Sequence, residues 1–153
     1  MATGRNARMR RMIGRSAAGL ALALLIALPV PTLAQPTGAE NFDAGWRFHQ
    51  GDVATAEQPG FADASWQSVD LPHDWAIAGP FDEHAPATGS GGFLPTGVAW
   101  YRKHFTLPPA SAGQRVFVEF DGVMERSGVW INGQHVGHRP RGYASFRYEI
   151  TQH

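Results

Sequence analysis

Apolar and polar residues alternate in several short runs that begin at residue 45 and continue to the end of the chain. Such alternation predicts half-buried β-strands, because successive side chains on a strand point to opposite faces. The alternating runs are "GWRFHQG" (45–51), "ASWQSVDLP" (64–72), "VAWYRKHFTL" (98–107), "RVFVEFDG" (115–122) and "YASFRYEIT" (143–151). No stretch of this region shows a convincing helical repeat of apolar residues. The pattern therefore predicts an all-β domain, a sandwich or barrel of antiparallel sheets.

A β-hairpin is expected around Asn132-Gly133, which separates "RSGVWI" from "QHVGH". Asn-Gly favours a type I′ turn, because both central residues then need positive φ. The register expected from this turn pairs Ile131 with Gln134, Trp130 with His135, and Val129 with Val136. One face, formed by the aliphatic residues, is then expected to join the core. Trp130 is expected on the opposite face, where it packs rather than stacks on a sugar.

The segment 79–97, "GPFDEHAPATGSGGFLPTG", is dense in glycine and proline and has no periodicity. Long ordered loops are uncommon unless they have a function. Gly91, Gly92 and Phe93 are candidates for a rim that contacts a ligand, since glycine allows close approach and the ring can pack on a sugar face. The alternative is an irregular crossover between two sheets, and the residues alone favour neither.

The segment after the hairpin, "HRPRGYASF", carries Arg139, Arg141 and Tyr143. Planar cationic donors and an aromatic ring suit a hydroxyl-rich ligand. A solvated turn with a glycine hinge is the alternative interpretation. In "LPHDW", adjacent His73 and Asp74 point apart on an extended chain, so a loop anchored by its tryptophan is favoured over a proton relay.

Residues 1–34 have the pattern of a secretory signal peptide. A basic stretch, "RNARMRRMIGR", precedes an apolar run of 12 residues, Ala17 to Leu28, and a small-residue exit at Ala34-Gln35. The run is too short for a membrane span, which needs about 20 residues. The sequence therefore predicts export to the periplasm or the extracellular space, with residues 35–44 as a linker and 45–153 as the folded domain.

Charge and composition exclude several classes of protein. The chain of 153 residues has 13 basic and 13 acidic residues and no cysteine. Five arginines lie in residues 1–34, so the remainder carries 8 − 13 = −5, which argues against a nucleic-acid partner. His135 and His138 would point to opposite faces of a strand, so no metal site is expected, and no other cofactor is indicated.

Three stretches in this order and spacing resemble the N-terminal sugar-binding domain of glycoside hydrolase family 2, with the β-galactosidase branch nearest. They are "LPHDW", "GGFLPTGVAWYRKHF" and "FDGVMERSGVWINGQHVGHRPRGYASFRYEIT", and the resemblance extends over residues 41–153. It implies a jelly-roll β-sandwich, galactose-binding-like, which is followed by an immunoglobulin-like domain and a TIM barrel. It also implies a carbohydrate partner, β-galactoside-like, and a loop of this domain at the rim of the active site.

In that family both catalytic glutamates lie in the barrel, and no glutamate of this chain lies in a matching stretch. The resemblance therefore implies an inactive fragment of a longer retaining glycosidase, with no catalytic residue here. We expect the sandwich to lack its last strand, which would leave an unpaired sheet edge. A stand-alone carbohydrate-binding module and a domain that only mediates packing between domains or subunits are the alternatives.

Overall fold

The structure is a computed structural model that describes residues 5–12 and 38–153. Its strands are β1 (Arg5–Met12), β2 (Glu40–Asn41), β3 (Trp46–Gln50), β4 (Gln67–Val69), β5 (Ala99–Arg102), β6 (Arg115–Gly122), β7 (Ser127–Ile131), β8 (Gln134–Arg139) and β9 (Phe146–Glu149). Three short 3-10 turns complete the regular structure: η1 (Trp75–Ala78), η2 (Gly89–Gly91) and η3 (Pro109–Ser111). No α-helix occurs in these residues, so the predicted all-β class is confirmed.

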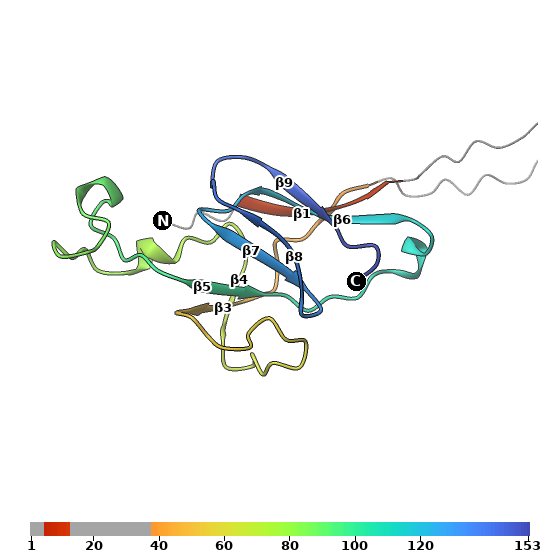
Figure 1. Cartoon of the computed structure of the whole chain (residues 1–153), viewed down its shortest axis with the longest axis horizontal. Coiled ribbons are helices and arrows are strands. Elements are labelled where there is room, and N and C mark those ends of the chain that lie inside the picture. Colours follow the sequence, from red (N-terminus) through yellow and green to blue (C-terminus); the bar gives the residue numbers. More distant parts are fainter. Residues whose placement is uncertain (1–4, 13–37) are drawn as a thin grey trace, which may run out of the picture.

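The strands form three antiparallel sheets (Figure 1). One sheet has the order β2-β1-β6-β9, the second has the order β4-β3-β5, and the third is the hairpin β7-β8. A single core cluster joins residues of the first two sheets, among them Trp46, Phe48, Val69, Val116, Val118, Phe120 and Phe146. The core therefore lies between these two sheets, as expected for a sandwich.

Alternation along the strands decides which residues enter this core. On β3, Trp46 and Phe48 are buried, whereas the alternate residues Arg47 and His49 are less covered. On β6, Val116, Val118 and Phe120 are buried on the same face. Both strands lie inside the ranges predicted from the apolar pattern.

The hairpin has the predicted turn, because φ is 49° at Asn132 and 82° at Gly133. Trp130 pairs with His135, and Ile131 pairs with Gln134, as predicted. An irregularity after Val129 shifts the next pair, so Val129 lies opposite Gly137 and not Val136. The expected pairing with Val136 was therefore wrong.

Packing of the hairpin on β9 explains why a glycine stands at this shifted position. A Cβ atom on Gly137 would lie 2.0 Å from Cε1 of Tyr148, a distance that real side chains do not adopt. The tyrosine ring therefore occupies the space that a side chain at position 137 would need. The irregularity brings this glycine into the pair with Val129, and the sequence pattern alone did not indicate it.

Three strands are clearly shorter than predicted: β4 and β9 at both ends, and β5 mainly at its end. After Arg102 the chain leaves the sheet to make side-chain contacts elsewhere. Lys103 donates a hydrogen bond to the carbonyl of Ala44, and His104 lies 2.8 Å from a carboxylate oxygen of Asp63. Phe105 packs edge-on against Phe42, with ring centroids 4.9 Å apart.

The fold also begins earlier than the predicted boundary at residue 45. Phe42 and Asp43 are buried, and Oδ1 of Asp43 accepts a hydrogen bond of 2.6 Å from the backbone of Ala7. Strand β1 lies in the stretch predicted as the basic part of a signal peptide, and it pairs with β2 and β6. The apolar run of that peptide lies outside the described residues. Within the described ranges, no helix is long and apolar enough to cross a membrane.

Candidate functional site

The two segments with candidate ligand contacts lie at the same end of the sandwich. In Figure 1 the loop that contains η2 projects to the left of the strands, and the connection between β8 and β9 lies on that side as well. Both connections are loops held by strands, which is the usual placement of binding residues. The sheet topology therefore places segments about fifty residues apart in sequence at one end of the molecule.

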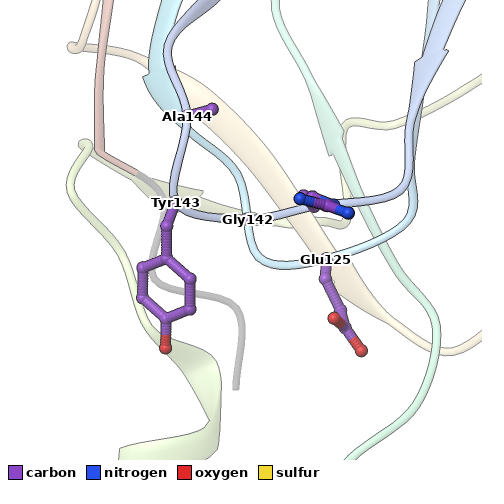
Figure 2. A pocket seen from close by; sticks show the side chains of 5 residues that line it. Glu125, Gly142, Tyr143 and Ala144 are labelled. Atoms are coloured by element: carbon purple, nitrogen blue, oxygen red, sulfur yellow. The ribbon is translucent and has the colours of Figure 1, made fainter.

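A pocket of about 390 Å³ lies at the connection between β8 and β9. It is lined by Glu125, Arg141, Gly142, Tyr143 and Ala144. Tyr143 is 83% exposed, so its ring is available to a ligand. Figure 2 shows the side chains of Tyr143 and Glu125 projecting on the same side of the loop. Arg141 and Tyr143 were both predicted as candidates, whereas Glu125 was not.

Close approach of two loops builds this pocket. A Cβ atom on Gly142 would lie 2.9 Å from Cα of Met124, which is too short for a real side chain. Glycine at this position therefore lets the turn lie directly against the segment that carries Glu125. The carboxylate of Glu125 and the guanidinium of Arg141 then line one pocket, where they can accept and donate hydrogen bonds to hydroxyl groups.

Glu125 could not be found by sequence reasoning, because its position in the pocket depends on this contact between loops. It lies between β6 and β7 in a turn without a distinctive motif. The only sequence signal is the glycine in "RGY", which indicates a turn but not the segment that the turn approaches.

Arg139, also a candidate, has a packing role in the structure. It ends β8, and its guanidinium lies over the rings of Phe146 and Tyr148, with distances of 5.5 Å and 5.8 Å to the ring centroids. Cation–π contacts of this kind stabilise the folded chain. Arg139 does not line the pocket with Arg141 and Tyr143.

Gly91, Gly92 and Phe93 do not line this pocket either. A Cβ atom on Gly91 would lie 2.2 Å from that of Ala87, and Gly92 has φ of +67°. Phe93 is 41% exposed and itself has a positive φ of 56°. The geometry of the loop accounts for both glycines without a ligand, and the exposed ring of Phe93 is the part of this segment that a ligand can reach.

A second pocket, of about 250 Å³, lies where the long loop leaves the sandwich. Its lining residues include Phe48, His73, Trp75 and Pro95. Nδ1 of His73 lies 2.8 Å from the hydroxyl of Tyr101, and burial raises the pKa of that hydroxyl, helped by the nearby charge of Asp74. Asp74 itself accepts from the backbone of Ala76, and the ring of His73 bonds instead to Tyr101. Trp75 is buried, which confirms the anchored loop.

No group of three or more metal-ligating side chains occurs within residues 5–12 and 38–153. His135 faces Trp130 across the hairpin, with ring centroids 5.1 Å apart. These two residues form a packing contact on the outer face, together with Trp100 of β5.

Comparison with known proteins identifies relatives whose names are those of glycosidases. The chain is 52% identical over 120 residues to the β-galactosidase BoGH2A of Bacteroides ovatus, which covers 78% of this chain and 14% of the relative. It is 37% identical over 113 residues to a putative β-glucuronidase of Formosa agariphila, with 74% and 11% covered. The chain therefore spans about one seventh of the length of BoGH2A, and less of the Formosa protein.

A solved structure supports the fold. A β-glycosidase from Bacteroides vulgatus superposes with a TM-score of 0.70 at 42% sequence identity, and the match covers 72% of this chain and 15% of that protein. The model of the sugar binding domain of glycosyl hydrolases family 2 matches residues 40–153. This range contains every described strand except β1, together with both pockets. The chain thus belongs to glycosyl hydrolases family 2, of which it holds the sugar binding domain.

Proposed function

We propose that this domain frames the substrate site of a β-galactosidase-like enzyme of family 2, in which further domains carry the catalytic groups. The observation that carries the proposal is the match of the family's sugar binding domain to residues 40–153. The 52% identity to a protein named β-galactosidase favours this branch over the β-glucuronidases, which share 37% or less.

The pocket at the connection between β8 and β9 is the place where we expect a sugar to be contacted. Arg141 can donate to ring or hydroxyl oxygens, and Glu125 can accept from hydroxyl groups. Tyr143 offers an exposed ring for the apolar face of a pyranose. Phe93, directly after η2 and Gly92, is a second exposed aromatic residue, and the loop that contains η2 lies at the same end of the sandwich.

The reaction of the parent enzyme is proposed to be hydrolysis of a β-galactoside with retention. Such enzymes place two carboxyl groups about 5–5.5 Å apart, one as nucleophile and one as acid and base. We assign neither role to a residue of this chain, so the domain alone should not hydrolyse a chromogenic β-galactoside. Measurable turnover by the purified 153-residue chain would refute this part.

Binding of methyl β-galactoside, measured by calorimetric titration, tests the pocket. A domain that only frames the site gives no detectable heat alone, whereas micromolar binding would favour a carbohydrate-binding module. If binding is seen, Tyr143→Ala should weaken it by about tenfold, which corresponds to about 1.4 kcal/mol. Ile77→Ala, at an exposed residue outside the pocket, is the matched control and should leave affinity unchanged.

We also propose that the protein is exported and cleaved near Ala34-Gln35. The basic stretch followed by an apolar run supports this proposal. Cleavage there would remove strand β1, so the exported form would have β6 open on that side. Intact-mass measurement of the exported protein tests the cleavage, and a mass that retains residues 1–34 would refute it.

A further inference from the structure

The second pocket has two walls, and the first of them belongs to the sheet β4-β3-β5. Phe48 of β3 pairs with Gln67 of β4, and Gln50 lies two residues after Phe48, on the same face of the strand. Phe48 is buried, whereas both glutamines are exposed. At this end of the sheet the inner face therefore changes from an apolar ring to two polar amides, and all three side chains line the pocket.

The second wall comes from the two ends of residues 79–97, the projecting loop. It contains residues of η1, the residues that follow η1, and Pro95 near the far end of the loop. A Cβ atom on Gly79 would lie 2.4 Å from Cγ of Pro95, which is too short for a real side chain. Glycine at position 79 therefore lets the two ends of the loop meet, and the wall that they form is held by close packing.

This second wall contains a hydrogen-bond donor without an acceptor. Trp75 is 5% exposed, and its Nε1 has no partner within residues 5–12 and 38–153. The indole of Trp46, which is 8% exposed, donates a bond of 2.9 Å to the carbonyl of Phe42, as buried tryptophans usually do. An unpaired donor in the wall of a pocket indicates that a molecule bound there supplies the acceptor.

His73 supplies a second donor to the same pocket. Its Nδ1 lies 2.8 Å from the hydroxyl of Tyr101, which is 3.5 Å from the carbonyl of the same histidine. Burial raises the pKa of the Tyr101 hydroxyl, so that group keeps its proton and donates it along the shorter contact. The neutral imidazole then carries its own proton on Nε2, which is left to donate to a ligand.

Charge distinguishes this pocket from the first one. The first pocket is lined by Glu125 and Arg141, whereas no carboxylate, ammonium or guanidinium group is among the residues that line the second. A charged ligand would lose its hydration in the second pocket without gaining a partner of opposite charge. The donors and amides suit a neutral molecule with several hydroxyl groups, and Phe48, Pro80 and Pro95 offer apolar contact to its C–H groups.

Size limits the ligand further. The volume of about 250 Å³ lies just below the range of about 300–1,000 Å³ that is typical of pockets for drug-sized molecules. It therefore suits a molecule as small as one sugar ring.

From these observations we propose that the second pocket binds one neutral pyranose unit. Its hydroxyl groups would bond to the N–H groups and amides of Trp75, His73, Gln50 and Gln67. The choice of a sugar rests on the proposed function, which gives this domain a carbohydrate partner, whereas the preference for an uncharged ligand rests on the lining residues alone. The domain would then contact carbohydrate at two places, one with charged side chains and one without.

Titration of the 153-residue chain with methyl β-galactoside, followed by NMR, tests this pocket. The indole N–H resonance of Trp75 should shift and saturate at millimolar sugar, since a few hydrogen bonds in a small pocket give a Kd of about 1 mM or weaker. This range is compatible with the absence of micromolar binding expected above. Galacturonate should bind at least about tenfold more weakly, because its carboxylate has no partner there.

A matched pair of glutamine variants locates the response. Gln67→Ala removes one amide from the pocket, at an exposed position of β4 where loss of the side chain does not disturb the core. It should weaken the binding seen at Trp75 by about fivefold. Gln134→Ala, at an exposed position of β8 outside the pocket, should leave that binding unchanged.

Three results would overturn the proposal. The first is the absence of a saturable shift at Trp75, which would leave water as the partner of its N–H group. The second is equal affinity for the galactoside and for galacturonate. The third is equal affinity of Gln67→Ala and Gln134→Ala.

A second neutral sugar separates this proposal from the proposed function. A shift of Trp75 with methyl β-glucoside but not with the galactoside would support a pocket for neutral sugars and count against the proposed β-galactoside substrate. Hydrolysis of galactosides by the parent enzyme, without a response of Trp75 to either sugar, would refute the pocket alone.

Discussion

Two irregular segments of this protein both lack an apolar repeat but differ in their structural roles. Residues 52–66 and residues 79–97 are both rich in turns and short of periodic apolar residues. The first is tied to the sandwich, with Ala56, Asp63 and Trp66 buried. The second projects from it, with Phe81 79% exposed and Phe93 41% exposed.

A single buried carboxylate explains much of this difference. Asp63 lies 2.9 Å from Nε of Arg102 and 2.8 Å from Nε2 of His104. Burial acts to raise the pKa of Asp63, but hydrogen bonds and charge from these two partners outweigh it, so the pKa is lowered. In the second segment, the carboxylate of Asp82 accepts a hydrogen bond from the backbone of His84, two residues away, and lies 3.3 Å from Nδ1 of the same histidine. A polar loop residue thus fixes its segment when its partner belongs to a distant strand.

Among substitutions in the two irregular segments, the largest expected effect is that of Asp63→Asn. It would leave Arg102, whose side chain is 12% exposed, without its ionic partner. Removal of one member of a buried ion pair costs about 3 kcal/mol of unfolding free energy. Urea denaturation checks this value. Asp82→Asn is the matched control, and it should change stability by less than about 0.5 kcal/mol; similar losses for both variants would contradict the comparison.

The next effect concerns the outer face of the hairpin. Trp130→Ala should cost about 2 kcal/mol, less than the 3–5 kcal/mol typical of a fully buried tryptophan, since the residue is 37% exposed. Thermal and urea unfolding measure the loss. Tyr143→Ala, at an aromatic residue that is 83% exposed, should change stability little. If Trp130→Ala instead reduced the free energy of galactoside binding by more than the free energy of unfolding, the packing role would be refuted.

Low pH should remove the stability that Asp63 contributes by holding residues 52–66 to the sandwich. The folded pKa of Asp63 lies below its unfolded value of 3.8, so its contribution is present above that pH. It is lost as the pH falls through the folded pKa, and stability therefore decreases below about pH 4. Urea unfolding of the wild type and Asp63→Asn between about pH 5 and pH 3 checks this: the difference between their free energies of unfolding should narrow as the pH falls. A constant difference would contradict the assignment.

The smallest effect is expected in the projecting loop. Phe93→Ala should lower the unfolding free energy by less than about 0.5 kcal/mol, because the ring is exposed and makes few contacts with the core. Phe48→Ala, in the core, is the contrasting variant and should cost about 3–5 kcal/mol. Unfolding curves of both variants measure the contrast. A large loss for Phe93→Ala would show that the loop is structural, like residues 52–66.

The strands and the hairpin turn could be predicted because their signals are local. Alternation predicted the ranges of β3 and β6 and the residues of each strand that face the core. Asn132-Gly133 predicted the two positive φ values of the turn. The predicted candidates Arg141 and Tyr143 line one pocket. Arg139 could not be separated from them, because its contacts with Phe146 and Tyr148 depend on how β9 packs against β8.

The sequence by itself determined the strands from residue 45 onward, the turn and the family resemblance, all of which depend on neighbouring residues or on ordered motifs. Only the tertiary structure decided which loops are anchored and which residues share a pocket. Asp63 meets Arg102 across 39 residues, and Glu125 reaches the Arg141 pocket because Gly142 allows two loops to touch. Contacts between residues so far apart depend on the sheet order and on steric fit, and a one-dimensional pattern contains neither.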